Sequence, residues 1–311
     1  MDHRFVLDAV TLDQLRTFVA VVEEGSFSAA GRRLQRVQSA VSSMVAALES
    51  QMGVSLFDRS GRFPQLTSAG TILLADARNV ISGVDLMKSR AKGMAAGVEP
   101  ELSVVIDVIF PLSAITNAAR DFREQFPGTP LRLYVEALGA AYQPILDGRA
   151  SLGIVGSLPT MPSSVTGERV AGVNMIPVAA SSHPLASFPG MIPRSEAARH
   201  VQLVLTDRSK LSAGREFGVI APFTWRLADL FAKHAFLLDG LGWGGMPFHA
   251  VSDDIAAGRL VVLDIEDMPV GGMVLPMHAV YSTGAPPGPA GRWFIDRIRS
   301  CNAEKDADAT T

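Results

Sequence analysis

The stretch "GSFSAAGRRLQRVQSAVSSMVAALES" (residues 25–50) predicts two short helices joined by a basic turn. Ser26 or Ser28 can cap the first helix. After the turn at residues 35–37, apolar residues recur at helical spacing along one face of the second helix. This apolar face carries Val41, Val45 and Leu48. The opposite face carries only small or polar side chains, namely Gln38, Ser39, Ser42 and Ser43.

Two helices with this pattern are typical of a helix-turn-helix. Small polar side chains let a helix lie deep in the major groove, where Gln pairs with adenine and Ser with either base edge. Ser28 at the start of the first helix joins this surface, and the basic side chains near the turn are placed to contact phosphates. These are Arg32, Arg33 and Arg36. The alternative is a helical hairpin whose polar face is only solvated.

The flanking sequence extends the domain on both sides. Thr11 and Gln14 form a predicted capping box at the start of a preceding helix, which Gly25 ends. On the other side, "LFDRSGRFPQLTSAG" (residues 56–70) predicts a β-wing. We expect Arg59 and Arg62 of this wing to reach the DNA backbone or the minor groove. A surface hairpin is the alternative here.

A long helix is predicted from about residue 68 to residue 94, with apolar residues at heptad spacing. A second copy of the same helix is the simplest partner for this stripe, because a two-fold dimer matches two DNA half-sites. The predicted dimerisation residues are Leu73, Ala77, Val80, Val84 and Met87. The alternative is that the stripe is buried within its own chain. Residues 95–101 follow as a linker.

The gapless segment "LDQLRTFVAVVEEGSFSAAGRRLQRVQSAVSSMVAALESQMGVSLFDRSGRFPQLTSAG" resembles the winged helix-turn-helix of LysR-type transcriptional regulators. The resemblance continues more loosely to residue 299. It implies an effector-binding domain like a periplasmic binding protein, and it places Ser39 and Ser42 on the recognition helix with Gln38 at its start.

The sequence departs from the family pattern at several positions. Ser43, Ala46 and Ala47 stand where the family often has basic or amide side chains, so we expect fewer phosphate contacts. The family often has a hydroxyl residue near Ala140 and an Asp near Ser151. The change at Ala140 implies a less polar effector, apolar or aromatic.

After residue 101 the pattern alternates strands and helices, which predicts a mostly parallel sheet covered by helices. Expected strands include residues 102–108, 131–138 and 201–205, and a terminal helix is expected at 290–299. Two α/β lobes crossed twice by the chain would enclose a cleft.

Ligands of open α/β sheets bind near strand ends and helix starts. Residues at such positions are the predicted effector contacts, although ordinary loop or cap roles would explain each of them. They are Leu112, Ser113, Gly139, Ala140, Tyr142, Thr206, Asp207, Trp243, Gly244 and Met246.

Other signals argue against competing classes of protein. "GLGWGG" (residues 240–245) matches a dinucleotide motif formally, but a helical pattern precedes it and Trp243 would crowd a pyrophosphate. Cys301 is the only cysteine, and the six histidines lack metal spacing, so we expect no metal and no cofactor. No apolar run is long enough to cross a membrane, and no secretory signal is present, which predicts a cytoplasmic protein. The charge is +2 over residues 1–95 and −5 over the remainder, which favours no class.

The sequence thus predicts an α/β multidomain protein. Its parts are a winged helix-turn-helix (1–67), a dimerisation helix and hinge (68–100), a two-lobed α/β effector domain (101–300) and a disordered tail (301–311). Lobe I is expected at about 101–172 and 271–300, and lobe II at about 173–270. The predicted function is a non-enzymatic, ligand-responsive regulator that binds double-stranded promoter DNA as a homodimer or homotetramer, with RNA polymerase as a further partner. The alternative is an α/β enzyme or solute-binding protein with an accessory helical domain.

Overall fold

The computed structural model describes residues 9–61, 63–158, 160–207, 209–212, 214 and 216–308, with side chains up to Cys301. The predicted contact residue Arg62 lies outside the described residues. The chain divides into two compact units, Met1–Lys92 and Gly93–Thr311. Each unit has its own buried core.

The first three helices of the N-terminal unit begin and end where the sequence predicts. Their bounds are α1 (Leu12–Glu24), α2 (Phe27–Arg33) and α3 (Gln38–Met52). The Gln14 N–H donates to Thr11 Oγ1 at 3.3 Å, and the Thr11 N–H donates to Gln14 Oε1 at 2.8 Å, which confirms the capping box. Ser26 caps α2, and α1 ends at Gly25 with a left-handed φ of 69°. Local sequence signals therefore set these helix ends.

Buried side chains join these helices to the wing. Val41, Val45 and Leu48 of α3 are fully buried in one cluster with Phe18 of α1. The wing strands pair antiparallel and are β1 (Phe57–Asp58) and β2 (Gln65–Leu66). The Phe57 ring meets the Phe18 ring edge-to-face with centroids 5.6 Å apart. Aromatic packing thus fixes the base of the wing against α1.

The long helix α4 (Ser68–Ala95) has two different halves. Leu73 and Ala77 pack into the core of their own N-terminal unit, contrary to the prediction that they face a second copy. Their spacing is that of a heptad seam, but they share an apolar cluster with residues of α1 and α3 of the same chain. Val80 and Met87 are exposed and Val84 is half-buried, so the predicted stripe remains open only beyond Ala77.

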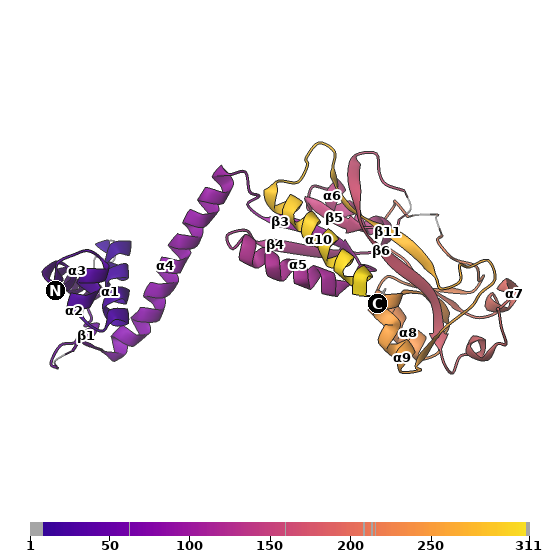
Figure 1. Ribbon diagram of the computed structural model, residues 1–311, viewed down its shortest axis with the longest axis horizontal. Helices are drawn as coiled ribbons and strands as arrows, with labels where there is room; N and C mark the ends of the chain where they lie inside the picture. Colours follow the sequence, from indigo (N-terminus) through magenta and orange to yellow (C-terminus); the bar gives the residue numbers. More distant parts are fainter. Residues whose placement is uncertain are drawn as a thin grey trace, which may run out of the picture. The chain divides into compact units, whose positions relative to one another are not determined.

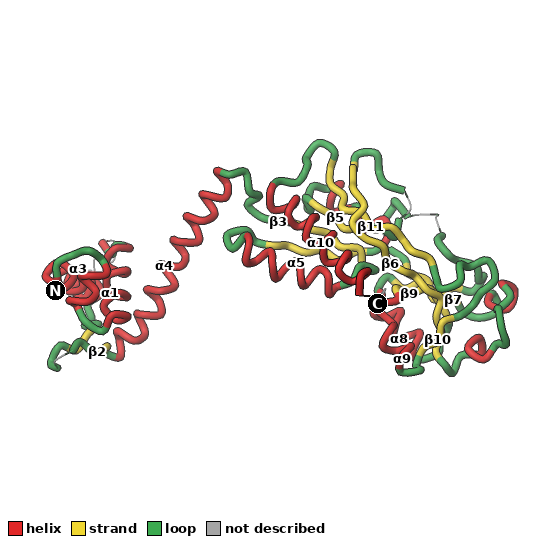
Figure 2. Tube along the Cα trace, in the orientation of Figure 1, coloured by secondary structure: helices red, strands yellow, loops and turns green. Residues whose placement is uncertain are grey.

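The C-terminal unit is built on one mixed sheet, seen as the yellow strands of Figure 2. The strand order is β4-β3-β5-β11-β6-β9-β7-β8, and β10 also pairs with β6. The strand bounds are β3 (Leu102–Asp107), β4 (Leu131–Glu136), β5 (Leu152–Val155), β6 (Val165–Ala180), β7 (Gln202–Leu205), β8 (Thr224–Leu227), β9 (Trp243–Pro247), β10 (Leu260–Val262) and β11 (Met273–Ser282).

Two long antiparallel strands connect the lobes. β6 pairs with β11 in its first part and with β9 and β10 in its second part. The chain therefore leaves lobe I within β6 and returns to it along β11. The parallel pairs are β3 with β4 and β5 in lobe I, and β7 with β8 and β9 in lobe II.

Helices cover this sheet and supply most of its apolar packing. Their bounds are α5 (Leu112–Gln125), η2 (Leu138–Ala141), α6 (Gln143–Leu146), η3 (Pro184–Ser187), α7 (Arg194–Ala197), α8 (Leu230–Leu238), α9 (Phe248–Ala256) and α10 (Pro289–Asp308). α5 and α10 lie side by side over lobe I in Figure 1. α8 and α9 contribute to the core of lobe II.

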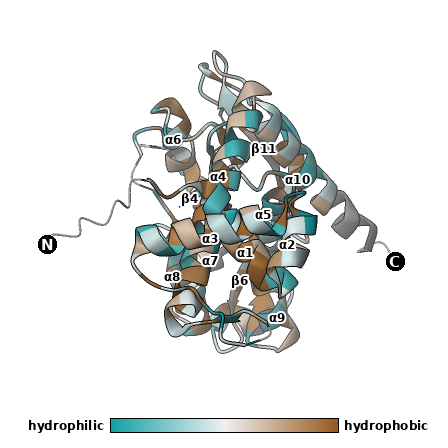
Figure 3. Cartoon of the chain, turned by 90° about the vertical axis from the view of Figure 1, so that its left-hand side faces the viewer, coloured by the Kyte–Doolittle hydropathy of each residue, from teal (hydrophilic) through white to brown (hydrophobic). Residues whose placement is uncertain are grey.

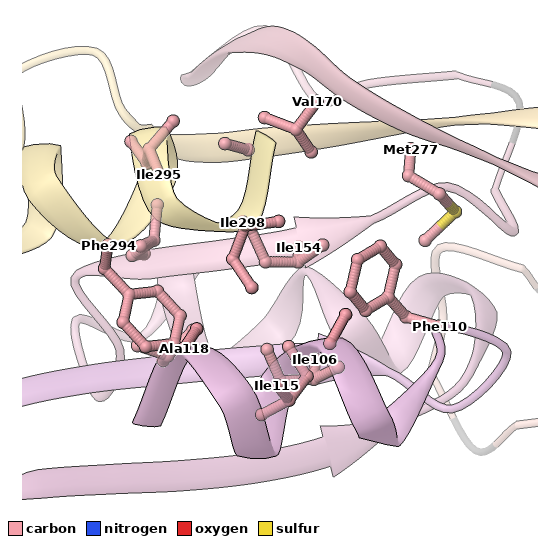
Figure 4. Close-up of a cluster of buried hydrophobic side chains, with 14 of the residues drawn as sticks. Ile106, Phe110, Ile115, Ala118, Ile154, Val170, Met277, Phe294, Ile295 and Ile298 are labelled. Atoms are coloured by element: carbon pink, nitrogen blue, oxygen red, sulfur yellow. The ribbon is translucent and has the colours of Figure 1, made fainter. Parts of the chain in front are cut away.

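The largest core cluster lies between α5, α10 and the lobe I strands (Figure 4). Phe294 and Ile298 of α10 point toward Ile115 and Ala118 of α5 in that view. Cys301 continues this buried seam, and α10 continues to Asp308. The sequence predicts disorder from residue 301, but the backbone is helical through residue 308. The helix continues past residue 300 because the Cys301 side chain still packs in the core of lobe I. Residues 309–311 lie outside the described residues.

None of the described helices is both long and apolar enough to cross a membrane. Figure 3 shows hydrophilic and hydrophobic stretches alternating along the helices. Within the same residues, no group of three or more His, Cys, Asp or Glu side chains could hold a metal ion.

Candidate nucleic-acid interface and effector cavity

The polar face of α3 is available at the surface of the N-terminal unit. Gln38, Ser39 and Ser43 are exposed and Ser42 is half-buried, opposite the buried valines. No residue of this face belongs to the core cluster of the unit. A helix with this surface can approach a groove without first uncovering apolar side chains.

The turn between α2 and α3 is tight. The Arg36 N–H donates to the Gly31 carbonyl at 2.8 Å, and a Cβ at residue 31 would lie 2.7 Å from the Arg36 carbonyl oxygen. Gln35 in the turn adopts a left-handed φ of 54°. Gly31 therefore fixes the angle at which α3 leaves α2.

Two of the predicted phosphate contacts are ion-paired within the unit. Arg33 Nη1 lies 2.7 Å from Glu23 and 3.2 Å from Glu24 at the end of α1, and this pairing holds the pKa of Glu23 below its usual value. Arg36 Nη1 lies 2.8 Å from Asp13. Exposed pairs of this kind contribute at most about 1 kcal/mol, so a phosphate can replace the carboxylate.

Arg32 differs from these arginines. Its side chain is exposed and donates to Ser28 Oγ at 3.2 Å. Among the predicted arginines that the structure describes, Arg32 is the one without a carboxylate partner. Arg59 of the wing pairs with Glu49 at 2.9 Å, and its guanidinium lies 5.0 Å from the Phe27 ring centre. Arg32 thus offers its charge to a phosphate with the least competition.

Glu49 holds the wing to the recognition helix, a role that sequence patterns did not reveal. Its Oε1 accepts hydrogen bonds from the backbone N–H groups of Leu56 and Phe57, at 2.8 and 3.1 Å. Its Oε2 pairs with Arg59. One carboxylate at the end of α3 therefore positions both the first wing strand and the wing arginine.

A cavity of about 1280 Å³ lies in the C-terminal unit, with residues of both lobes in its lining. Lobe I contributes Tyr142 and Ser157, and lobe II contributes Leu203, Leu230 and Lys233. Ligand sites commonly reach about 300–1,000 Å³, so this space is ample for a small molecule.

A buried carboxylate organises the lobe I side of this cavity. Asp107, at the end of β3, is fully buried and accepts hydrogen bonds from the N–H groups of Gly156 and Ser157, at 3.2 and 2.9 Å. The Ser157 hydroxyl also donates to Asp107 and accepts from the Leu138 N–H at 2.9 Å. Burial raises the pKa of Asp107, while these donors oppose the shift. The network ties the ends of β3 and β5 to η2.

A hydrogen bond joins the two lobes directly. The Asp207 carboxylate of lobe II accepts from the Ala140 N–H of lobe I at 2.6 Å, and Ser212 donates to the same carboxylate. A Cβ at Gly139 would lie 2.2 Å from Ser209 Oγ. The absence of a side chain at residue 139 therefore lets this loop of lobe II lie against η2.

Comparison with protein families assigns both units. Residues 12–71 match the bacterial regulatory helix-turn-helix protein of the lysR family, and residues 95–301 match the LysR substrate binding domain. The chain belongs to the LysR family. It is a transcriptional regulator with a helix-turn-helix and an effector-binding domain, and the alternative of an enzyme or solute-binding protein is not favoured.

Named relatives of this LysR regulator are themselves regulators. The probable HTH-type transcriptional regulator YhaJ of Escherichia coli is 30% identical over 268 residues, covering 83% of this chain and 87% of YhaJ. The HTH-type transcriptional regulator AceR of Acinetobacter baumannii is 28% identical, covering 94% of this chain and 97% of AceR.

Solved structures agree on the fold. A hydrogen peroxide-bound mutant of OxyR from Corynebacterium glutamicum aligns with a TM-score of 0.56 at 22% identity, covering 96% of each chain. A putative LysR family regulator from Pseudomonas aeruginosa aligns with a TM-score of 0.52 at 19% identity, covering 94% of this chain and 99% of that chain.

Four of the predicted effector contacts line the cavity of this LysR regulator. They are Tyr142, Thr206, Asp207 and Trp243. Burial and the nearby Asp107 raise the pKa of Tyr142 to about 12, so its phenol stays a neutral donor. Six predicted contacts are not among the lining residues: Leu112, Ser113, Gly139, Ala140, Gly244 and Met246.

The "GWGG" segment shows why strand position misled the prediction. Its residues from Trp243 onward lie in β9 (Trp243–Pro247), so successive residues point to opposite faces of the sheet. Trp243 lines the cavity and donates from its indole N–H to the Ala197 carbonyl at 3.0 Å. Met246 is buried in the core of lobe II, and a Cβ at Gly244 would lie 2.4 Å from the Leu203 carbonyl oxygen. The glycine allows close strand packing, not phosphate binding.

Two buried polar residues of the cavity were missed because neither follows a strand end or begins a helix. Gln202 donates to the Gly218 carbonyl at 2.7 Å and accepts from the Ile220 and Ala221 N–H groups, which holds the loop before β8 in place. Lys233, in the first half of α8, is the second.

Proposed function

We propose that this LysR regulator binds promoter DNA as a homodimer or homotetramer, with the α3 helices of two copies in successive major grooves. The exposed polar face of α3, from Gln38 to Ser43, is the observation that carries the proposal. Ser28 and Arg32 at the start of the motif, and Arg59 of the wing, would contact the backbone on either side of the groove.

The open half of α4 supports self-association. Val80, Met87 and Met94 expose apolar side chains on a helix of 28 residues, with Val84 half-buried between them. A second α4 would cover this stripe and place two recognition helices about one helical turn of DNA apart.

The cavity between the lobes is the proposed effector site. Its lining includes apolar side chains such as Leu203, Leu230 and Met175, which suits a small molecule with an apolar or aromatic body. A ligand that binds one arrangement of the lobes better shifts the population toward it, and thereby changes contacts with DNA or RNA polymerase in the cytoplasm.

An electrophoretic mobility shift with the promoter adjacent to the gene tests the DNA-binding part. Ser42→Glu puts a carboxylate on the recognition face, so we expect it to abolish specific retention. Ser195→Glu adds the same charge at an exposed site of the C-terminal unit and should bind as the unchanged protein does. Equal retention of both variants would contradict the proposed role of α3.

The salt dependence of binding tests the role of Arg32. Because it has no carboxylate partner among the described residues, Arg32→Ala should lower the slope of log K against log salt by about one unit. It should weaken specific and non-specific binding alike. An unchanged slope would show that Arg32 does not contact a phosphate.

A further inference from the structure

Lys233 is a buried cation in the wall of the effector cavity. Its side chain is on α8, is 4% exposed and lines the cavity. Nζ donates to the Gly245 carbonyl of β9 at 2.7 Å. An ammonium group has three N–H donors. Across the described part of the chain, the Gly245 carbonyl is its single hydrogen-bond acceptor, so two donors are left for another partner.

Four carboxylates of the described residues line the cavity, and none of them forms an ion pair with Lys233. Glu216 is ion-paired with Arg226, and the Asp207 carboxylate accepts from the Ala140 N–H. The Glu266 carboxylate accepts from the Arg194 N–H, and Asp267 is the fourth. No ion pair joins Lys233 to a carboxylate among the residues that the structure describes. The cavity wall therefore contains a buried ammonium group that no carboxylate of the described residues pairs with directly.

Such a group is costly to keep. A buried lysine without a counter-charge destabilises the fold, and burial lowers the pKa of Lys233 to about 8. Even so, the group remains mostly cationic near neutral pH. The neighbouring residues also accommodate it, since a Cβ at Gly244 would lie 3.2 Å from Lys233 Cε.

We propose that Lys233 binds a carboxylate group of the effector, whose apolar body lies against the aliphatic wall of the cavity. The inference deepens the proposed effector site and rests on it. The carboxylate would supply the missing counter-charge and accept the two free N–H donors. Leu203 and Leu230, which line the same cavity, would contact the apolar part. Arg194 also lines the cavity, but its side chain is exposed to solvent and forms a weaker site for an anion.

The test uses pairs of molecules of nearly equal shape, one an anionic acid and the other its neutral amide. Benzoate, phenylacetate and hexanoate are compared with benzamide, phenylacetamide and hexanamide on the full-length protein. Thermal shift detects binding, and titration calorimetry measures Kd. The variants are Lys233→Met, which keeps the length of the side chain, Arg194→Met, and Lys88→Met as a control on an exposed lysine of α4.

We expect at least one acid to stabilise the unchanged protein while its amide does not. Lys233→Met should weaken that acid by at least about 30-fold, because one partner of a buried charge pair is removed. Lys88→Met should bind as the unchanged protein does. Each shift is taken relative to the ligand-free variant, and circular dichroism checks that Lys233→Met is folded.

Three results would overturn the proposal: no acid binds, acid and amide bind equally, or the acid still binds tightly to Lys233→Met. Loss of acid binding in Arg194→Met alone would also overturn it. A mobility shift on the same samples separates the two proposals. If the acid binds through Lys233 but the protein does not retain the promoter, only the proposed DNA binding is contradicted. If the protein retains the promoter specifically but binds acid and amide equally, only the role of Lys233 is contradicted.

Discussion

Replacing Lys233 with methionine should stabilise the protein, in contrast to most substitutions at buried positions. Burial lowers the pKa of this lysine from 10.5 to about 8. That difference corresponds to about 3 kcal/mol of unfavourable free energy in the folded state at neutral pH. Methionine removes this cost but leaves the Gly245 carbonyl without its donor, a loss of about 1 kcal/mol. The net gain of about 2 kcal/mol should raise the Tm of the C-terminal unit by roughly 4–8 °C.

The pH dependence distinguishes this cause from better packing. Between pH 8 and 10.5 the unfolded chain binds a proton at Lys233 that the folded chain does not, so the stability of the unchanged protein rises with pH. The cost is fully present below about pH 8, and at about pH 9.5 about 2 kcal/mol of it is relieved. Calorimetry of both proteins at about pH 7 and pH 9.5 should therefore show the advantage of Lys233→Met nearly disappearing. A variant that is less stable, or equally favoured at both pH values, would refute the reasoning.

Three further substitutions test the N-terminal unit. Glu49→Ala should lower the free energy of unfolding of this unit by about 2–3 kcal/mol, because two backbone N–H donors lose a charged acceptor. Hydrogen exchange at the Leu56 amide should accelerate, and an unchanged rate would contradict the role of Glu49 in holding the wing. Gly31→Ala should destabilise the unit by about 1–3 kcal/mol through its clash with the Arg36 carbonyl, measured by urea unfolding, and a neutral effect would contradict it. Val84→Asp should dissociate the proposed dimer by burying a charge, and a light-scattering mass equal to that of the unchanged protein would contradict the α4 interface.

Both ends of α1 and the start of α2 were predictable because short-range chemistry sets them. A capping box at Thr11, a Ser26 cap and a left-handed Gly25 each act within a few residues, and the structure shows all three. The heptad seam of α4 failed at Leu73 and Ala77 for the opposite reason. Spacing along a helix shows which residues share a face, but it does not show whether that face meets α1 of the same chain or a second copy.

The cavity proposed for the effector was harder to predict than the helix-turn-helix. The positions after strands selected Tyr142, Thr206 and Asp207, which line the cavity, and their contact with an effector stays a prediction. The same rule selected Leu112, which the structure leaves exposed outside the lining. Lys233 gave no signal, because a lysine on a helix is usually solvated and only the tertiary packing of α8 against β7 and β9 buries it.

The two buried charges near the cavity differ in how completely the fold satisfies them. Asp107 receives hydrogen bonds from three backbone N–H groups and the Ser157 hydroxyl, so its carboxyl group holds the strand ends together. The three N–H donors of the Lys233 ammonium group have one acceptor between them, the Gly245 carbonyl. Both side chains are buried, yet the described part of the chain supplies a full set of hydrogen-bond partners for only one of them. A buried ammonium group with two N–H donors left unpaired is best explained by a bound ligand that accepts them. The search for the effector should therefore begin with acids.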